Sequence, residues 1–246
     1  MKINQLLLSI LVSLTLSATN APTATHPVAV IELFTSQGCS SCPPADRLLM
    51  ETADKAIAAK QPVYALSFHV DYWDGLGWRD PFSDARFTAR QRQYARRLAL
   101  ETLYTPQAIL NGTQVFVGSN RARLTSLLTE ALNQPAPITI QAKAAQEGGS
   151  VRIETKLSGT LSGAVLNVAL VSNSVSTVVR KGENAGRTLT HSNVVRAFTT
   201  IRATESGQVT LPLPANFDPA AGAVITYLQH EKTLAVLGAA RVALNK

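Results

Sequence analysis

The two cysteines of this 246-residue chain, Cys39 and Cys42, lie three positions apart in the stretch FTSQGCSSCPPADRLL. Thiols at this spacing fit three kinds of chemistry: half of a metal site, a small structural disulfide, or a redox pair that cycles between dithiol and disulfide. A structural zinc site requires four ligands, and a disulfide that closes so short a loop stabilises a fold by only about 2 kcal/mol. The spacing therefore favours the redox pair.

The elements predicted around the cysteines place them where a strand ends and a helix begins. The continuous apolar run VAVIELF (28–34) is typical of a strand buried on both faces, and residues 44–59 have apolar side chains at helical spacing. The N-terminus of a helix stabilises a thiolate and so lowers the pKa of a cysteine there. We expect Cys39 to be the more exposed thiol and the nucleophile, and Cys42 to release the partner from the mixed disulfide.

A second group of candidate residues follows the next predicted strand (63–70). The segment FHVDYWDGLGWRDPF (68–82) precedes a helix predicted over 83–100, with Ser83 as its N-cap. Loops that follow parallel strands emerge at one edge of a sheet, so this loop is expected to border the cysteine pair. A compact loop packed by its own aromatic side chains is the alternative. The residues assigned to substrate contact are His69, Asp71, Tyr72, Trp73 and Trp78.

The segment VVRKGENAGRTLTHSNVVR (178–196) supplies possible accessory residues from the second half of the chain. Its glycines predict a hairpin turn that could reach over the cysteine site. The accessory candidates are Glu183, Asn184 and His191. The alternative is an exposed hairpin whose histidine is satisfied locally.

The N-terminus has the features of a secretory signal. Lys2 is followed by an apolar run from Leu6 to about Leu16 and then by small residues. This run is shorter than the roughly 20 residues that span a bilayer. We therefore predict a signal peptide over 1–24, an exported protein (periplasmic or secreted), and no stable membrane insertion after cleavage. Disulfides persist in such compartments.

The charge distribution argues against a nucleic-acid partner. Residues 138–246 carry 11 Lys and Arg against 6 Asp and Glu, whereas residues 27–137 carry 11 against 10. The basic residues of the C-terminal half are not clustered with aromatic side chains, as they are in many nucleic-acid-binding surfaces.

The two halves differ in their pattern of elements. Residues 27–134 alternate strand and helix signals, including a hairpin with an Asn111–Gly112 turn, and predict a mixed sheet flanked by helices. After the proline-containing linker at 133–139, residues 138–246 contain regularly spaced Val-, Ile- and Thr-rich runs. We therefore expect an α/β domain followed by an all-β, sandwich-like domain.

The order of elements in the first half resembles the thioredoxin superfamily. The resemblance is carried by a strand, by Cys-x-x-Cys opening a helix, and by a later proline, Pro106, before a β-hairpin. It implies a thioredoxin-like fold for the first domain and a cis Pro106 that faces the cysteine pair. It also implies that the backbone of Thr105 binds an extended substrate segment. Glu32 lies near the position of the buried acid of thioredoxins and would serve as a proton relay, unless it is a surface or ion-paired residue.

Four segments together resemble one exported thioredoxin-like family, catalogued as domain of unknown function 1223. They are ELFTSQGCSSCPPAD, HVDYWDGLGWRDPF, YTPQ and GENAGRTLTHSNVVRA. This resemblance implies a fold and an exported location, and it implies no particular substrate.

The leading hypothesis is an exported thiol–disulfide oxidoreductase without a resident cofactor or metal. Its partner would be a thiol or disulfide, carried by a protein or a small molecule. One alternative is a copper-handling protein, in which both thiolates and His69 or His191 bind Cu(I). Another is a non-catalytic binding module, in which the β-rich half recognises a partner.

Overall fold

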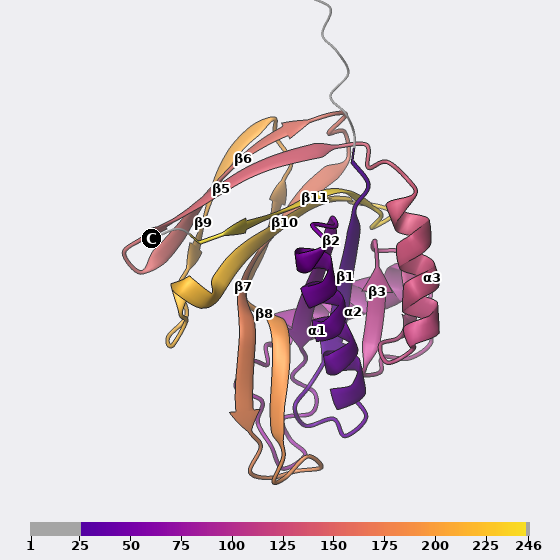
Figure 1. The fold of residues 1–246 in the computed structure, drawn as a ribbon, viewed down its shortest axis with the longest axis vertical. Coiled ribbons are helices and arrows are strands. Elements are labelled where there is room, and N and C mark those ends of the chain that lie inside the picture. The colour runs from indigo at the N-terminus through magenta and orange to yellow at the C-terminus, as the bar shows by residue number, and fades with distance from the viewer. Residues whose placement is uncertain (1–25, 245–246) are drawn as a thin grey trace, which may run out of the picture.

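The computed structural model describes residues 26–244, so the predicted signal peptide lies outside the described residues. The described chain is mostly β-structure (Figure 1). Its helices are α1 (Pro43–Ala58), α2 (Ala85–Arg97) and α3 (Arg121–Leu132), with a 3-10 turn η1 (Pro219–Ala221). Its strands are β1 (Ala29–Thr35), β2 (Val63–His69), β3 (Gln107–Leu110), β4 (Gln114–Val117), β5 (Thr139–Glu147), β6 (Ser150–Ser158), β7 (Ala164–Val178), β8 (Thr188–Arg202), β9 (Ser206–Pro212), β10 (Gly222–His230) and β11 (Val236–Ala243). None of the helices within residues 26–244 combines the length and apolar character that crossing a bilayer requires.

Eight strands form one mixed sheet in the order β11-β10-β7-β8-β2-β1-β3-β4. β1 and β2 are parallel, while β3 and β4 continue the sheet in antiparallel fashion. On the other side of β2, β8 runs parallel to it and is paired through Ser67 and Val194. The remaining strands form a separate antiparallel sheet in the order β5-β6-β9.

The expected fold class, a thioredoxin-like α/β domain followed by a separate sandwich-like domain, is wrong. Strands from both halves share one sheet, because β8 occupies the outer edge of β2 and thereby joins β7, β10 and β11 to β1–β4. A first domain on its own would leave that edge of β2 with unpaired backbone N–H and C=O groups. The pairing of β2 with β8 joins segments that lie far apart in the chain, so no local sequence pattern indicated it.

The two faces of β1 belong to different cores. Successive side chains of a strand point to opposite faces. Ile31 and Leu33 therefore pack beneath α1 and α3, whereas Val30 and Phe34 face α2 and the strands β7, β8 and β10. A third core fills the space between the three-stranded sheet and β7, β10 and β11. Helix α1 also lies against β8, as Figure 1 shows.

Two connections reach the start of α1. The long strands β7 and β8 extend past the other strands at the lower end of Figure 1, and residues 179–187, named the hairpin tip below, join them. Residues 70–84 connect β2 to α2 and are named the aromatic loop.

Local predictions are largely confirmed. The turn between β3 and β4 is Asn111–Gly112, with φ values of 46° and 74°. Helix α2 lies within the predicted range, but its N-cap is Asp84, whose carboxylate accepts a hydrogen bond from the Arg86 N–H at 2.8 Å. The expected cap, Ser83, was therefore wrong by one residue.

Candidate redox site around the Cys39–Cys42 disulfide

Cys39 and Cys42 form a disulfide at the start of α1. Cys42 is the N-cap residue of the helix, and Pro43 and Pro44 occupy its first turn. Proline is tolerated there because the N–H groups of a first turn make no hydrogen bond within the helix. Cys39 lies in the turn that leads from β1, with its N–H bonded to the Ser36 carbonyl at 3.2 Å. The predicted strand-to-helix junction is thus confirmed, and both cysteines lie at the positive end of α1.

Thr105 and Pro106 precede β3 beside this junction. The peptide bond between them is cis, as predicted. The sulfur of Cys39 lies 3.9 Å from the Thr105 carbonyl oxygen and 3.4 Å from Ser41 Oγ. The Ser41 hydroxyl also donates to that carbonyl, at 3.5 Å. A backbone acceptor and a hydroxyl group therefore face the more N-terminal sulfur.

The aromatic loop packs against the cysteine-containing turn through both tryptophans of the chain. The indole N–H of Trp73 donates to Thr105 Oγ1 at 2.9 Å, and that of Trp78 donates to Gln37 Oε1 at 3.1 Å. A Cβ atom added to Gly38 would lie 3.1 Å from the Cβ of Trp73, so the turn and the loop are in close contact. Two of the predicted substrate-contact residues are thus part of the site.

The hairpin tip covers the same turn from another side. The side-chain amide of Asn184 donates to the carbonyl oxygens of Gln37 and Cys39, at 3.0 and 2.9 Å. The carboxylate of Glu183 accepts a hydrogen bond from the Ser40 N–H at 3.1 Å. Hydrogen bonds from Ser40 lower the pKa of Glu183. Two of the three accessory residues named from the sequence, Glu183 and Asn184, therefore hold the second half of the chain onto the cysteine turn.

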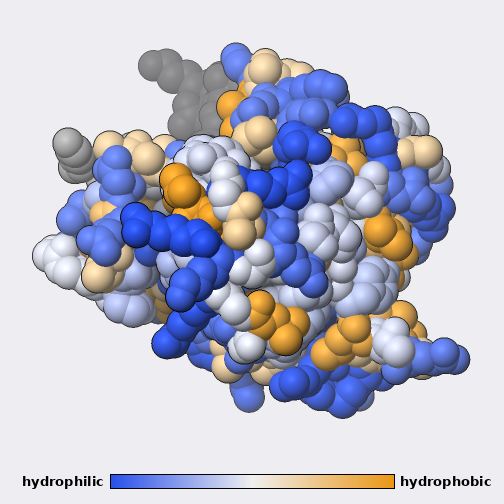
Figure 2. Space-filling view, turned by 90° about the horizontal axis from the view of Figure 1, so that it is seen from below, coloured by the Kyte–Doolittle hydropathy of each residue, from blue (hydrophilic) through white to orange (hydrophobic). Residues whose placement is uncertain are grey.

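Both cysteines are fully buried, with 0% of either residue exposed. The expectation that Cys39 would be the more exposed of the two thiols is therefore wrong, because the hairpin tip and the aromatic loop pack against the cysteine turn. Ser40 and Ser41, between the two cysteines, are exposed. Figure 2 views the molecule from this end and shows a mostly hydrophilic surface with separate hydrophobic spots.

Four buried titratable side chains meet next to the first turn of α1 and are named the His–Asp cluster. They come from four segments: Asp46 of α1, His69 of β2, Asp80 of the aromatic loop and His191 of β8. His69 Nδ1 lies 2.7 Å from an Asp80 oxygen, and His191 Nδ1 lies 3.5 Å from an Asp46 oxygen. The two imidazole rings are 4.6 Å apart and nearly perpendicular. His69 and His191, named from the sequence as separate candidates, therefore belong to one cluster.

The charges within the cluster shift two pKa values in opposite directions. Burial by itself lowers the pKa of His69, but the carboxylates of Asp80 and Asp46 outweigh it, so this pKa lies above its ordinary value. Burial raises the pKa of Asp80, but His69 and the N–H groups of Gln37 and Phe82 lower it below its ordinary value overall. Both shifts favour an imidazolium–carboxylate pair.

The other half of the cluster has unused hydrogen-bonding capacity. One Asp46 oxygen accepts a hydrogen bond from the Thr35 hydroxyl at 2.9 Å. Within residues 26–244, the second Asp46 oxygen, both ring nitrogens of His191 and the Nε2 of His69 have no hydrogen-bond partner. Buried polar atoms normally have one, because leaving them unpaired costs free energy.

Glu32 does not lie in this cluster. It is on the face of β1 that packs against α2, where it pairs with Arg90 at 2.5 Å and accepts a hydrogen bond from Tyr94. Of the two roles considered for Glu32, the structure supports the ion-paired one. No sequence pattern distinguished Arg90 from the four other arginines of the same predicted helix.

Two of the predicted contact residues face α2 instead of the disulfide. Asp71 accepts a hydrogen bond from the Thr88 hydroxyl at 2.5 Å, and the Tyr72 hydroxyl donates to Gln91 at 3.3 Å. These contacts anchor the aromatic loop to α2.

Sequence reasoning missed Asp46 and Asp80. Asp46 follows Cys42 by four positions, and residues four apart lie on the same side of a helix, so its spacing was a usable signal. Asp80 carried no comparable signal, because its contacts with His69 and Gln37 join segments that meet only in the folded chain.

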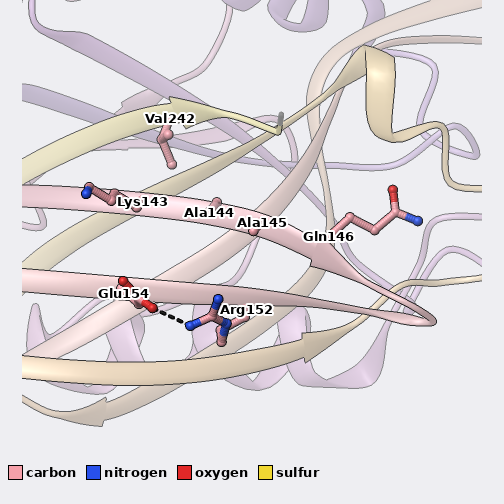
Figure 3. A pocket seen from close by; sticks show the side chains of 7 residues that line it. All are labelled: Lys143, Ala144, Ala145, Gln146, Arg152, Glu154 and Val242. Carbon is pink, nitrogen blue, oxygen red and sulfur yellow. Dashed lines mark hydrogen bonds and ion pairs between the residues drawn. The ribbon is translucent and has the colours of Figure 1, made fainter. Parts of the chain in front are cut away.

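A pocket lined by β5, β6 and β11 lies at the other end of the molecule from the hairpin tip (Figures 1 and 3). Its Arg152 is paired with Glu147 at 2.6 Å and also with Glu154. These side chains are partly exposed ion pairs, so they offer no buried reactive group. Within residues 26–244, no three His, Cys, Asp or Glu side chains are grouped as ligands for a metal ion.

Comparison with protein families matches residues 30–229 to the family described as "Protein of unknown function (DUF1223)". The chain belongs to this family. The resemblance noted in the four sequence segments is thereby confirmed.

Two solved structures are similar to this DUF1223 protein. Protein AGR_C_4864 from Agrobacterium tumefaciens is 31% identical, with a TM-score of 0.66 over 91% of this chain and 97% of that one. HBP35 of Porphyromonas gingivalis has a TM-score of 0.64 at 15% identity, over 92% of this chain and 77% of that one, a likeness that concerns the fold alone. No curated protein matches the sequence. The function of this DUF1223 protein must therefore be argued from its site.

Proposed function

We propose that this DUF1223 protein is an exported thiol–disulfide oxidoreductase that acts through Cys39 and Cys42. The observation that supports this most directly is the disulfide at the N-terminus of α1, beside the Thr105 carbonyl. A disulfide with two intervening residues contributes little stability by loop closure. A thiolate at the same place is stabilised by the helix N-terminus, which is what a redox cysteine requires.

The proposed reaction is a two-step exchange. The Cys39 thiolate attacks one sulfur of a substrate disulfide, whose S–S bond breaks and releases one substrate thiolate. The Cys42 thiolate then attacks Cys39, forms the Cys39–Cys42 bond and releases the second substrate thiolate. Two electrons pass from the protein to the substrate, and the reverse sequence oxidises a substrate dithiol.

The proposed likeness to the thioredoxin superfamily is limited to this site. It consists of two features: Cys-x-x-Cys at the start of a helix, and Thr105 with the cis proline Pro106 beside the cysteines. In this proposal the backbone of Thr105 pairs with an extended substrate segment, as an unpaired strand edge does. Trp73 binds only the Thr105 side chain, so in this proposal the Thr105 carbonyl exchanges its hydrogen bond from the Ser41 hydroxyl for one from the substrate backbone.

Substrate access requires the hairpin tip to move, because both sulfur atoms are buried. The contacts that tie the tip to the cysteine turn include the three hydrogen bonds made by Asn184 and Glu183. Each such bond contributes about 1 kcal/mol. Breaking them costs a few kcal/mol, so a small fraction of molecules would have the hairpin tip open. We propose that the closed form protects the disulfide and that an open form exchanges it.

An exported location is part of the proposal. It is supported by Lys2, by the apolar run 6–16 and by the small residues that follow. Outside the cytoplasm, the oxidised pair would persist between reactions.

The test is to trap the intermediate. A Cys42→Ser variant in the reduced form, mixed with oxidised glutathione, should accumulate a glutathione adduct on Cys39, seen by intact-protein mass spectrometry. A Cys39→Ser variant should form the adduct at least 10-fold more slowly, because its remaining thiol lies further into the helix. The matched control, with both cysteines replaced by serine, should form none.

Equal adduct formation by the two single variants, or none by either, would contradict the proposal. Titration of the wild type in glutathione redox buffers should also give a reversible transition between dithiol and disulfide. Its midpoint defines the reduction potential and hence the favoured direction of exchange.

A further inference from the structure

We infer that the His–Asp cluster is the proton donor and acceptor of Cys42. In this assignment Asp46 and His191 exchange the proton with the thiol, and His69 and Asp80 are positioning residues that orient His191. The inference rests on the proposed function, since it concerns a step of that reaction.

The need for such a group follows from burial. When the disulfide is reduced, Cys42 leaves as a thiolate, and an ionised group in a dry interior is destabilised unless it is paired or protonated. Cys39 is in a different position, because its sulfur is adjacent to Ser41 Oγ and the exposed serines of the turn. Cys42 therefore needs a proton source inside the protein.

The geometry of α1 directs this role to Asp46. Cys42 has helical backbone angles (φ −77°, ψ −37°), and its carbonyl accepts the N–H of Asp46 at 3.1 Å. In a regular helical turn of this kind, side chains four positions apart lie on the same side. Asp46 is only 3% exposed and Cys42 is fully buried, so both side chains of this turn are in the interior.

The unpaired atoms of the cluster support proton transfer over a structural role. A carboxylate and an imidazole that only stabilised the fold would be expected to use their hydrogen-bonding atoms. Here one Asp46 oxygen and both ring nitrogens of His191 are buried and unpaired, at a His191–Asp46 distance of 3.5 Å. Thr35 holds the other Asp46 oxygen and so orients the free one.

The charged groups that face His191 come from every segment around it. Asp46 of α1 faces it from one side, and the His69 ring lies 4.6 Å away on the other. His69 is in turn held by Asp80. Arg196, also on β8, lies over the ring of Phe82 and opposes protonation of His69. The surroundings of the Asp46–His191 pair therefore contain charges of both signs.

The thiolate of a reducing dithiol attacks Cys39, the Cys39–Cys42 bond breaks, and Cys42 leaves with the electron pair. The Asp46–His191 pair gives its proton to the Cys42 sulfur and later recovers one from water. The second reductant thiolate displaces Cys39, so the reductant ends as a disulfide and the protein as a dithiol.

The experiment measures how the proton requirement depends on pH. Oxidised protein is reduced with dithiothreitol from pH 5 to 9 in a stopped-flow instrument, and each rate is divided by the concentration of reductant thiolate. The wild-type rate should fall with rising pH, because the step consumes a proton that the cluster supplies. Asp46→Asn and His191→Gln should give flat profiles, about 100-fold slower at the acid end, since general acid catalysis contributes roughly 10²–10⁴-fold. His230→Gln, a substitution outside the cluster, should match the wild type.

His69→Gln separates positioning from proton transfer. It should keep the fall in rate but move its midpoint, because His69 acts through His191. Wild-type profiles for folded Asp46→Asn and His191→Gln would overturn the inference, and if one variant does not fold, the other decides. If Cys42→Ser traps the adduct on Cys39 but the profiles are unchanged, the inference alone fails. If no adduct forms, the proposed function fails and the inference with it.

Discussion

Burial determines how the ionisable residues of this site behave. His69, predicted from the sequence as a substrate contact, and His191, predicted as an accessory residue, are 0% and 1% exposed. Each faces a carboxylate from another segment, Asp80 or Asp46. In the interior, the state of an ionisable group depends on its partner more than on solvent. The protonation of this cluster is therefore a property of the folded protein.

The His69–Asp80 pair makes stability depend on pH. The raised pKa of His69 gives a contribution that is complete below its ordinary pKa of 6.5 and is lost as the pH rises through the folded value. The lowered pKa of Asp80 gives a contribution that is present above 3.8 and is lost as the pH falls through the folded value. The free energy of unfolding of Asp80→Asn should therefore be lower than that of the wild type by about 3 kcal/mol between about pH 4 and 6.5. The difference should be smaller outside this range.

Urea unfolding of both proteins in the disulfide form, at pH values from 3 to 9, measures this difference. Asp54→Asn, on the exposed side of α1, is the matched control and should change the free energy of unfolding by less than about 0.5 kcal/mol at every pH. A difference for Asp80→Asn that stays constant over the whole range would show that the pair is not ionised as described.

Among the elements, the β7–β8 hairpin carries the segment that packs against the cysteine turn. Its two 15-residue strands carry the tip to the cysteine turn. Gly182 has a φ of +76°, and a Cβ added there would lie 3.2 Å from the Cβ of Trp78. The tip and the aromatic loop therefore fit together only because this residue has no side chain.

Removing the side-chain amide of Asn184 should loosen the tip. Asn184→Ala loses two hydrogen bonds to the cysteine turn, each contributing about 1 kcal/mol, so the open form should be more populated. We expect a water-soluble phosphine to reduce the disulfide about 10-fold faster or more, as measured by the appearance of free thiols. Asn133→Ala, at the exposed C-terminus of α3, should leave the rate unchanged. An unchanged rate in Asn184→Ala would mean that the tip does not limit access.

At the scale of the whole molecule, the two halves of the chain form one structural unit. Arg90 of α2 pairs with Glu32 of β1 and donates a hydrogen bond to the Tyr227 hydroxyl of β10 at 2.8 Å. Its guanidinium group also lies over the rings of Tyr94 and Phe198. The sequence predicted a separate domain for each half of the chain. This buried contact and the β2–β8 pairing instead connect the two halves.

Glu32→Gln tests this connection. It leaves the Arg90 charge buried without its partner, so the free energy of unfolding should fall by about 3–5 kcal/mol. Unfolding should remain a single transition in urea, with coincident curves from near- and far-ultraviolet circular dichroism. The pH profile of disulfide reduction should not change, because Glu32 faces α2.

The control for this variant is Glu51→Gln, which removes an exposed ion pair with Arg121 and should cost less than about 1 kcal/mol. Two separate unfolding transitions in either protein would refute the description of the halves as one unit. A changed pH profile of disulfide reduction in Glu32→Gln would indicate that Glu32 takes part in proton transfer.

The sequence by itself determined the features that depend on neighbours along the chain. These include the cysteine pair at a strand-to-helix junction, the Asn111–Gly112 turn and the approximate limits of the helices. Hydrophobic period, turn residues and prolines act over a few positions, so they can be interpreted without the fold. The cis bond before Pro106 and the family membership also followed from the sequence, through resemblance to known patterns.

Only the tertiary structure decided which distant segments meet. A strand edge can pair with many others, so the joining of β2 to β8 had no local signal, and the prediction of separate domains failed there. The charge on Glu32 gave no indication that Arg90 would neutralise it in the interior. The same holds for the burial of both cysteines and for the His–Asp cluster, because four segments must pack together before these side chains leave water.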